Sequence, residues 1–175
     1  RTELLVYSKA MSGIYLQEGE DSQRISFVHG AHVQPRLSPD GTRIASGSVD
    51  GSLKVWDASS RQQSFTLKGH TARVVNVAFS PDGQMLASAG HNKRLILWNV
   101  SGEPEDPLVL GAPFKAHFQA VRTVAFSPNG QMMASGGDDE MIILWDTSSR
   151  RPLAEPMRGH NGGVRSVAFS PDGAR

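Results

Sequence analysis

The stretch that decides the fold is Val77-Ala78-Phe79-Ser80-Pro81-Asp82-Gly83, because nearly the same seven residues return twice along the chain. The later copies occupy residues 124–130 and 167–173, and a weaker copy occupies residues 37–41. The prolines of the four copies are 42, 47 and 43 residues apart, and the three tryptophans, which end a second recurring run, are 42 and 47 apart. Self-similarity at a period slightly over forty predicts an array of repeated structural units.

Each period holds apolar runs of four to seven residues separated by clusters of Gly, Pro, Asp and Ser, which is typical of short strands joined by turns. In the Ser-Pro-Asp-Gly sequence, proline presets the dihedral of the second turn position and glycine accommodates the exit, as in a type I turn between antiparallel strands. No stretch shows helical periodicity, so an all-β protein is predicted. The expected strands of the best-defined period are 73–79, 85–90, 95–99 and 108–111, and those of the first thirty residues are 4–7, 13–16 and 24–28.

The composition excludes several classes of protein. The 175 residues are 38% hydrophobic and 20% charged, as in a globular chain, and the net charge of +1 cannot attract nucleic acid or an anionic membrane by bulk charge. The absence of cysteine excludes disulfide and thiolate chemistry and favours a reducing, cytoplasmic location. No apolar run approaches the roughly 20 residues of a membrane span. Since the chain starts with Arg1 and ends with Arg175 just after a turn signal, we expect a piece of a longer protein.

Four strands in a repeat of this length resemble the WD-repeat β-propeller family. Its Gly-His opening stands at residues 69–70 and 159–160, and its Trp-Asp ending stands at residues 56–57 and 145–146, with Trp-Asn at 98–99. The resemblance implies a propeller of four-stranded antiparallel blades, with about four blades' worth of strands that form part of a larger propeller. The expected boundaries are a degenerate partial blade with strands b, c and d (1–30), three repeats (31–68, 69–115 with an insertion between strands c and d, and 116–158) and strand a of a further repeat (159–175).

In this family, a buried His, Ser or Thr, Asp and Trp form a hydrogen-bonded tetrad within each blade. The positions that match this pattern are His70, Ser88, Asn92 and Trp98; His117, Ser135, Asp139 and Trp145; Ser46, Asp50 and Trp56; and His160. In the first two sets the residues follow the histidine by 18, 22 and 28 positions. Asn92 keeps an acceptor but lacks the negative charge, so we expect the weaker tetrad there. His29 lies one position too close to join the tetrad of the first repeat.

Ser, His and Asp in one repeat also suggest a serine hydrolase. The repetition argues against this hypothesis, because an enzyme needs one constellation at one cleft, whereas buried polar groups need hydrogen bonds in every blade. A hydrolase site in the central channel remains the alternative function. His29 and His32 are three residues apart, but no acidic or cysteine partner stands at ligand spacing, so no metal site and no cofactor are predicted.

The resemblance implies that partners bind at the rim, three and five residues after each tetrad histidine and one residue before the tetrad Asp. Those positions hold Arg73, Val75 and His91; Ala120, Arg122 and Asp138; and Gly163 and Arg165. Three arginines suggest an acidic or phosphorylated peptide, held by bidentate hydrogen bonds. The alternative is a solvated rim in which Asp138 pairs with a neighbouring Arg. Nucleic acid is disfavoured, because the rim lacks aromatic residues for base stacking.

The sequence therefore predicts a non-catalytic interaction scaffold or sensor with protein or peptide partners. The regularity of the repeats is similar to that of bacterial WD-repeat arrays. That similarity implies a signalling protein with an attached NTPase or kinase domain.

Overall fold

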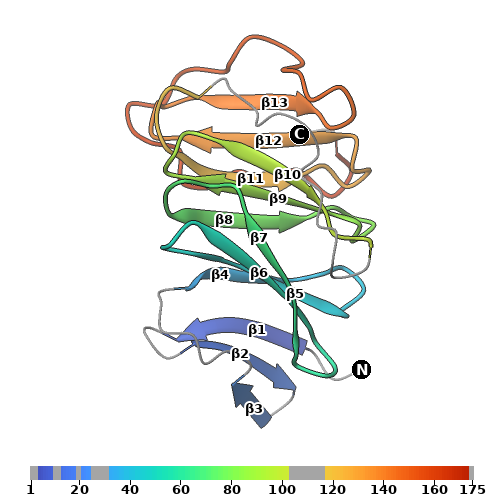
Figure 1. Ribbon diagram of the computed structural model, residues 1–175. Helices are drawn as coiled ribbons and strands as arrows, with labels where there is room; N and C mark the ends of the chain where they lie inside the picture. The colour runs from blue at the N-terminus through green and yellow to red at the C-terminus, as the bar shows by residue number, and fades with distance from the viewer. Residues whose placement is uncertain (1–3, 10–12, 19–20, 25–31, 103–116, 174–175) are drawn as a thin grey trace.

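The computed structural model consists of antiparallel β-sheets stacked in a row (Figure 1). It describes residues 4–9, 13–18, 21–24, 32–102 and 117–173, and no helix occurs among them. The all-β prediction is thus confirmed for the described chain. The strands are β1 (Leu4–Lys9), β2 (Gly13–Glu18), β3 (Asp21–Arg24), β4 (His32–Leu37), β5 (Arg43–Ser48), β6 (Ser52–Asp57), β7 (Gln63–Lys68), β8 (Val74–Phe79), β9 (Met85–Gly90), β10 (Leu95–Asn99), β11 (Val121–Phe126), β12 (Met132–Gly137) and β13 (Ile142–Asp146).

Each sheet is a meander in which consecutive strands pair. One sheet has four strands, β4-β5-β6-β7, and the others are β1-β2-β3, β8-β9-β10 and β11-β12-β13. The fourth strand expected at residues 108–111 lies outside the described residues. In the last sheet, residues 152–157 run beside β13 and pair with it only through bridges at Pro152 and Met157.

Two predicted strands differ from the structure by more than two residues at an end. The third strand was expected at residues 24–28 and is instead β3 at 21–24, because β2 and β3 already pair at Glu18 and Asp21, which leaves only two residues for the connection. Residues 25–28 lie outside the described part. The expected strand a within 159–175 joins no ladder. Two of its amides donate to the preceding sheet, Val164 to the Gly137 carbonyl (2.9 Å) and Val167 to Thr123 Oγ1 (3.3 Å). No described residue pairs with this segment as a strand b.

The repeated turn is built as its sequence indicates. The Ser80 amide donates to the Met85 carbonyl and the Gly83 amide donates to the Ser80 carbonyl, both at 2.9 Å. Gly83 has a φ of +71°, and the corresponding glycines have φ values of +75°, +71° and +71° at positions 41, 130 and 173. Only glycine adopts this left-handed conformation without steric cost, which explains its return in every repeat.

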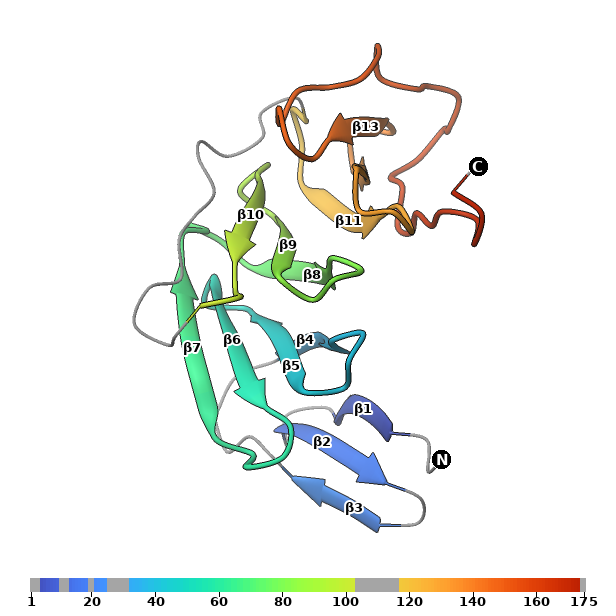
Figure 2. The ribbon, with the colours of Figure 1, turned by 90° about the vertical axis from the view of Figure 1, so that its right-hand side faces the viewer.

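The sheets follow one another along a curved row, with β4, β8 and β11 on the same side and β1–β3 and β11–β13 at the two ends (Figure 2). The apolar core lies between neighbouring sheets. Alternate residues of β10 serve two cores: Ile96 and Trp98 pack toward the β4–β7 sheet, whereas Leu95 and Leu97 pack toward the β11–β13 sheet. A strand buried on both faces reads as a continuous apolar run, as this one does.

The row of sheets leaves two sets of connecting turns on opposite faces. The β9–β10 and β12–β13 turns share one face with the segments that enter β8 and β11, because the His91 amide bonds the Arg73 carbonyl and the Asp138 amide bonds the Ala120 carbonyl, both at 2.9 Å. Among the described residues, no helix is present that could cross a membrane.

Candidate interaction surface

The tetrad of the last complete repeat is buried behind the rim. His117 Nδ1 lies 2.9 Å from Asp139 Oδ2 and its Nε2 lies 2.7 Å from Ser135 Oγ, to which Trp145 Nε1 also donates at 2.8 Å. Since a carboxylate only accepts, Nδ1 carries the proton of the bond to Asp139. Asp139 additionally accepts the Phe118 amide at 3.0 Å, so the tetrad fastens the segment before β11 to the β12–β13 turn.

The preceding repeat has the same arrangement with an amide in place of the carboxylate. His70 Nδ1 lies 2.8 Å from Asn92 Oδ1, His70 Nε2 lies 2.7 Å from Ser88 Oγ, and Trp98 Nε1 donates to Ser88 Oγ at 2.8 Å. Burial lowers the pKa of His70, the Asn92 hydrogen bond opposes this shift, and the Arg94 charge adds to it. His70 is therefore neutral at pH 7.

In the first repeat, the described residues do not make the same hydrogen bonds as in the two later tetrads. Asp50 is exposed and bonds its own turn through the Ser52 amide (2.8 Å) and hydroxyl (2.7 Å), and Trp56 Nε1 is buried without a partner. Ser46 is buried and is not without a partner. The bond from Trp56 Nε1 to the serine, present in the two later repeats, is therefore absent here, and the grouping of Ser46, Asp50 and Trp56 as a tetrad stays a prediction. His29 lies outside the described residues.

The two described tetrads share a position that the sequence analysis overlooked, twenty residues after the tetrad histidine. Gly90 and Gly137 stand there, and a Cβ at these positions would lie 2.5 Å from His70 Nδ1 and 2.9 Å from His117 Nδ1. The first repeat carries Ser48 at the equivalent position, and the Ser48 hydroxyl accepts the Asp50 amide at 3.4 Å. The glycine is therefore part of the tetrad signal.

His160 is exposed. A serine, an aspartate and a tryptophan at the repeat spacing would stand at positions 178, 182 and 188, beyond the last residue of this chain, so no tetrad forms around it here.

The rim residues of neighbouring repeats form one polar network. Arg122 Nε donates to both carboxylate oxygens of Asp138 at 2.8 Å, its Nη2 also bonds this carboxylate, and its Nη1 donates to His91 Nε2 at 2.6 Å. Arg165 Nη1 approaches Asp138 Oδ1 at 3.4 Å. Asp138 thus pairs with a neighbouring Arg, as in the alternative considered for the rim. The contact with His91 crosses from one repeat to the next, 31 residues away, and no local pattern signals it.

The other rim positions lie around this network. Arg73 and Arg165 are exposed, whereas Val75 and Ala120 are half-buried. Gly163 packs against the acidic residue, because a Cβ there would lie 2.7 Å from Asp138 Oδ1. The rim therefore has a fixed centre, formed by the hydrogen-bonded Arg122, Asp138 and His91, and two exposed arginines, Arg73 and Arg165.

The charges of the rim follow from these contacts. The Arg122 hydrogen bonds hold the pKa of Asp138 below its ordinary value. Burial lowers the pKa of His91, and the charges of Arg122 and Arg73 lower it further. At pH 7, Asp138 is ionised and His91 is neutral and accepts from Arg122. Among the described rim residues, Arg73 has no ion pair, and Arg165 shares Asp138 with Arg122 while its side chain stays 68% exposed.

The two tetrads combine Ser and His with Asp139 in one repeat and Asn92 in the other, but neither gives a substrate access to its serine. Ser88 and Ser135 have no exposed surface, and each hydroxyl is held by a histidine and a tryptophan. Within the described residues, no group of three or more His, Cys, Asp or Glu side chains could hold a metal ion.

Comparison with known proteins defines the class. The family described as "WD domain, G-beta repeat" matches residues 22–57, 61–99, 109–146 and 151–175. The chain therefore belongs to the WD-repeat family. In a solved structure described as "Crystal Structure of Mitotic Checkpoint Complex", one chain superposes with a TM-score of 0.83 at 22% identity over 91% of this chain and 48% of that one. This likeness shows the fold alone and confirms a propeller-type array.

Similar curated proteins are components of eukaryotic assemblies. The U5 small nuclear ribonucleoprotein 40 kDa protein of Pongo abelii is 40% identical over 63 residues, which cover 36% of this chain and 18% of that protein. The Set1 complex component swd1 of Schizosaccharomyces pombe is 36% identical over 86 residues, which cover 49% of this chain and 22% of that protein. The matches thus span less than a quarter of either relative. The expected bacterial character and the attached NTPase or kinase domain stay predictions.

Proposed function

We propose that the chain is a non-catalytic protein interaction module whose rim binds an acidic or phosphorylated segment of a partner protein. The observation that carries the proposal is the Arg122–Asp138–His91 network, which joins two repeats into a fixed surface. A surface that is already ordered loses little conformational entropy on binding, so a short segment can bind it with few contacts. The names of the similar proteins, which include a ribonucleoprotein component and a Set1 complex component, support a role within assemblies.

The charges of the rim favour an acidic partner. Asp138 is occupied by Arg122, whereas the Arg165 side chain is 68% exposed and Arg73 is also exposed. Guanidinium groups bind carboxylates and phosphates through paired hydrogen bonds. An extended segment with two anionic residues could therefore contact Arg73 and Arg165 while it crosses the fixed centre.

A catalytic propeller is the second function considered. The burial of Ser88 and Ser135 disfavours it, because a nucleophile must reach its substrate. The lack of cysteine supports a reducing, cytoplasmic location, which is likewise a proposal.

The proposal is tested with a labelled peptide that carries two phosphoserines flanked by glutamates, with fluorescence anisotropy as the readout. We expect Arg73→Glu combined with Arg165→Glu to weaken binding at least tenfold, because each change replaces attraction with repulsion. Arg151→Glu is the matched control, since Arg151 is an exposed arginine just after the turn that follows β13, on the face opposite the rim. An equal loss with Arg151→Glu, or unchanged binding by the double variant, contradicts the proposal.

A further inference from the structure

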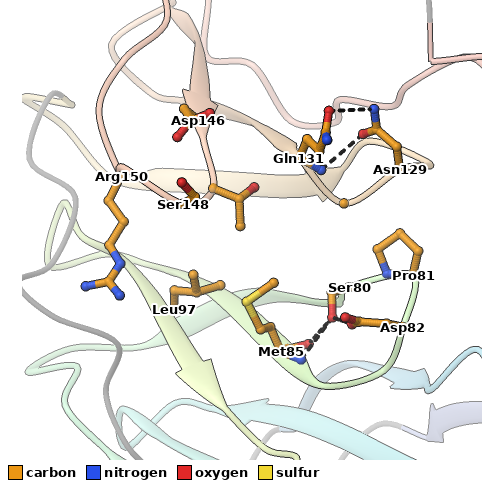
Figure 3. A pocket seen from close by; sticks show the side chains of 12 residues that line it. Ser80, Pro81, Asp82, Met85, Leu97, Asn129, Gln131, Asp146, Ser148 and Arg150 are labelled. Atoms are coloured by element: carbon orange, nitrogen blue, oxygen red, sulfur yellow. Dashed lines mark hydrogen bonds between the residues drawn. The ribbon is translucent and has the colours of Figure 1, made fainter.

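A pocket of about 630 Å³ opens on the face opposite the rim, between the β8–β10 and β11–β13 sheets (Figure 3). One wall comes from the β8–β9 turn and β10, and the other comes from the β11–β12 turn and the segment after β13. The pocket therefore lies between two repeats and shares no residue with the rim.

The floor of the pocket is apolar. Leu97, which is 2% exposed, and half-buried Met85 lie side by side along the lower wall in Figure 3, with Pro81 beyond them. A floor of this kind binds an aliphatic side chain by removing apolar surface from water.

Two lining residues have polar atoms without a partner. Thr147 is only 7% exposed and its Oγ1 has no hydrogen bond, and Nε of Arg150 is also buried and unpaired. Both atoms are closed off from solvent, so they lie behind the pocket surface and do not contact a bound molecule in this conformation.

Two carboxylates complete the lining. The Ser80 hydroxyl lowers the pKa of Asp82, and the Ser149 amide lowers the pKa of Asp146, so both are ionised at neutral pH. A carboxylate has about four acceptor positions, and these turn contacts leave some of them available. In Figure 3, Asp82 lies at the end of the pocket opposite Arg150, with the apolar floor between them.

We propose that this pocket binds an extended segment of a partner protein that inserts one aliphatic side chain between the repeats and places a neighbouring basic side chain at Asp82. The aliphatic side chain of the segment rests on Met85 and Leu97. The opposite charge preferences of the two faces let the chain hold an acidic segment at the rim and a basic one here. The pocket proposal does not depend on the function proposed for the rim.

The test uses methyl-labelled methionine, because Met85 is one of six methionines and lines the pocket. Its resonance is assigned by its loss in Met85→Leu. The probes are Ac-Gly-Leu-Arg-Gly-NH₂, the same peptide with Ser for Leu, and the same peptide with Glu for Arg. We expect the Leu-Arg peptide to shift the Met85 methyl in a saturable manner, and each altered peptide to need at least fivefold more ligand for half saturation.

Two protein variants distinguish a contact with Asp82 in the pocket from a general effect of removing an aspartate from the repeated turn. Asp82→Asn should weaken binding of the Leu-Arg peptide at least threefold. Asp40→Asn should leave it unchanged, because Asp40 makes the same turn contacts to Ser38 and the residue 42 amide but does not line this pocket. The proposal is overturned if no peptide moves the Met85 methyl, if the Leu and Ser peptides bind equally, if the Glu peptide binds better, or if the two variants behave alike.

Discussion

At the scale of single residues, the same serine position has different surroundings in successive repeats. Ser88 and Ser135 are each bonded by a histidine and a tryptophan, whereas Ser46 lies in a repeat whose tryptophan Nε1 has no partner. The partner of the histidine also differs. Asp139 contacts its histidine with both oxygens and accepts an amide as well, whereas Asn92 offers one amide oxygen. This difference determines how the repeats respond to acid.

The stability of the chain should fall on acidification because of His70. Its pKa in the folded state lies below the ordinary value of 6.5, so between these two pH values the unfolded chain binds more protons than the folded one. The free energy of unfolding therefore decreases as the pH falls below about 6.5. Above that pH His70 is neutral in both states, and the stability is not reduced by its protonation. Burial also lowers the pKa of His91, which contributes with the same sign.

Asn92→Asp should reduce this loss, because a carboxylate beside Nδ1 favours protonated His70 and raises its pKa. The measurement is urea unfolding between pH 5 and 7.5, together with an NMR titration of the His70 imidazole. Asn129→Asp is the matched control, since it makes the same change in a turn whose hydrogen bonds involve Ser127 and Gln131 and no histidine. An unchanged pH slope in Asn92→Asp would contradict the account.

At the scale of elements, the sequence pattern predicted strand ends correctly where an apolar run and the turn next to it are adjacent in the sequence. β9 and β10 have the predicted ends, and β8 starts one residue later than predicted. The start of β3 was predicted three residues too late, because it depends on pairing with β2 rather than on the polar sequence Asp21–Arg24 itself. The tetrad positions follow from the resemblance and its spacing, which did not reveal how closely Gly90 and Gly137 approach the tetrad histidines. The rim network also joins residues that are 31 positions apart, which no local pattern reveals.

The repeated turn should be sensitive to its glycine. Gly130→Ala places a Cβ at a φ of +71° and 3.4 Å from Pro81 Cδ, so the left-handed conformation should cost about 1–2 kcal/mol of unfolding free energy. Gly102→Ala is the control, because a Cβ there meets nothing within 4 Å, and its effect should stay within about 0.5 kcal/mol. Urea denaturation measures both, and equal values would show that the turn does not require glycine.

At the scale of the whole molecule, each sheet is stabilised by its neighbours, and the end sheets have one neighbour. Corresponding residues show the effect. Leu95 and Leu97 of β10 are 1% and 2% exposed, whereas Ile142 and Leu144 of β13 are only partly buried. The outer side of the last sheet therefore carries apolar surface that an internal sheet covers.

This surface should make the 175-residue chain self-associate, because large exposed apolar patches bind one another in water. Leu153 and Met157, which run beside β13, are 48% and 47% exposed. Light scattering should give a mass that rises with concentration above the 18.9 kDa of one chain, and Leu153→Lys with Met157→Lys should return it toward that value. Val49→Lys is the matched control, since Val49 is 46% exposed but lies in the β5–β6 turn away from the last sheet. A constant monomer mass, or equal effects of the Leu153/Met157 and Val49 changes, would mean that the exposed apolar surface of the last sheet does not cause association. The stability of each repeat would then come from within the sheet rather than from stacking.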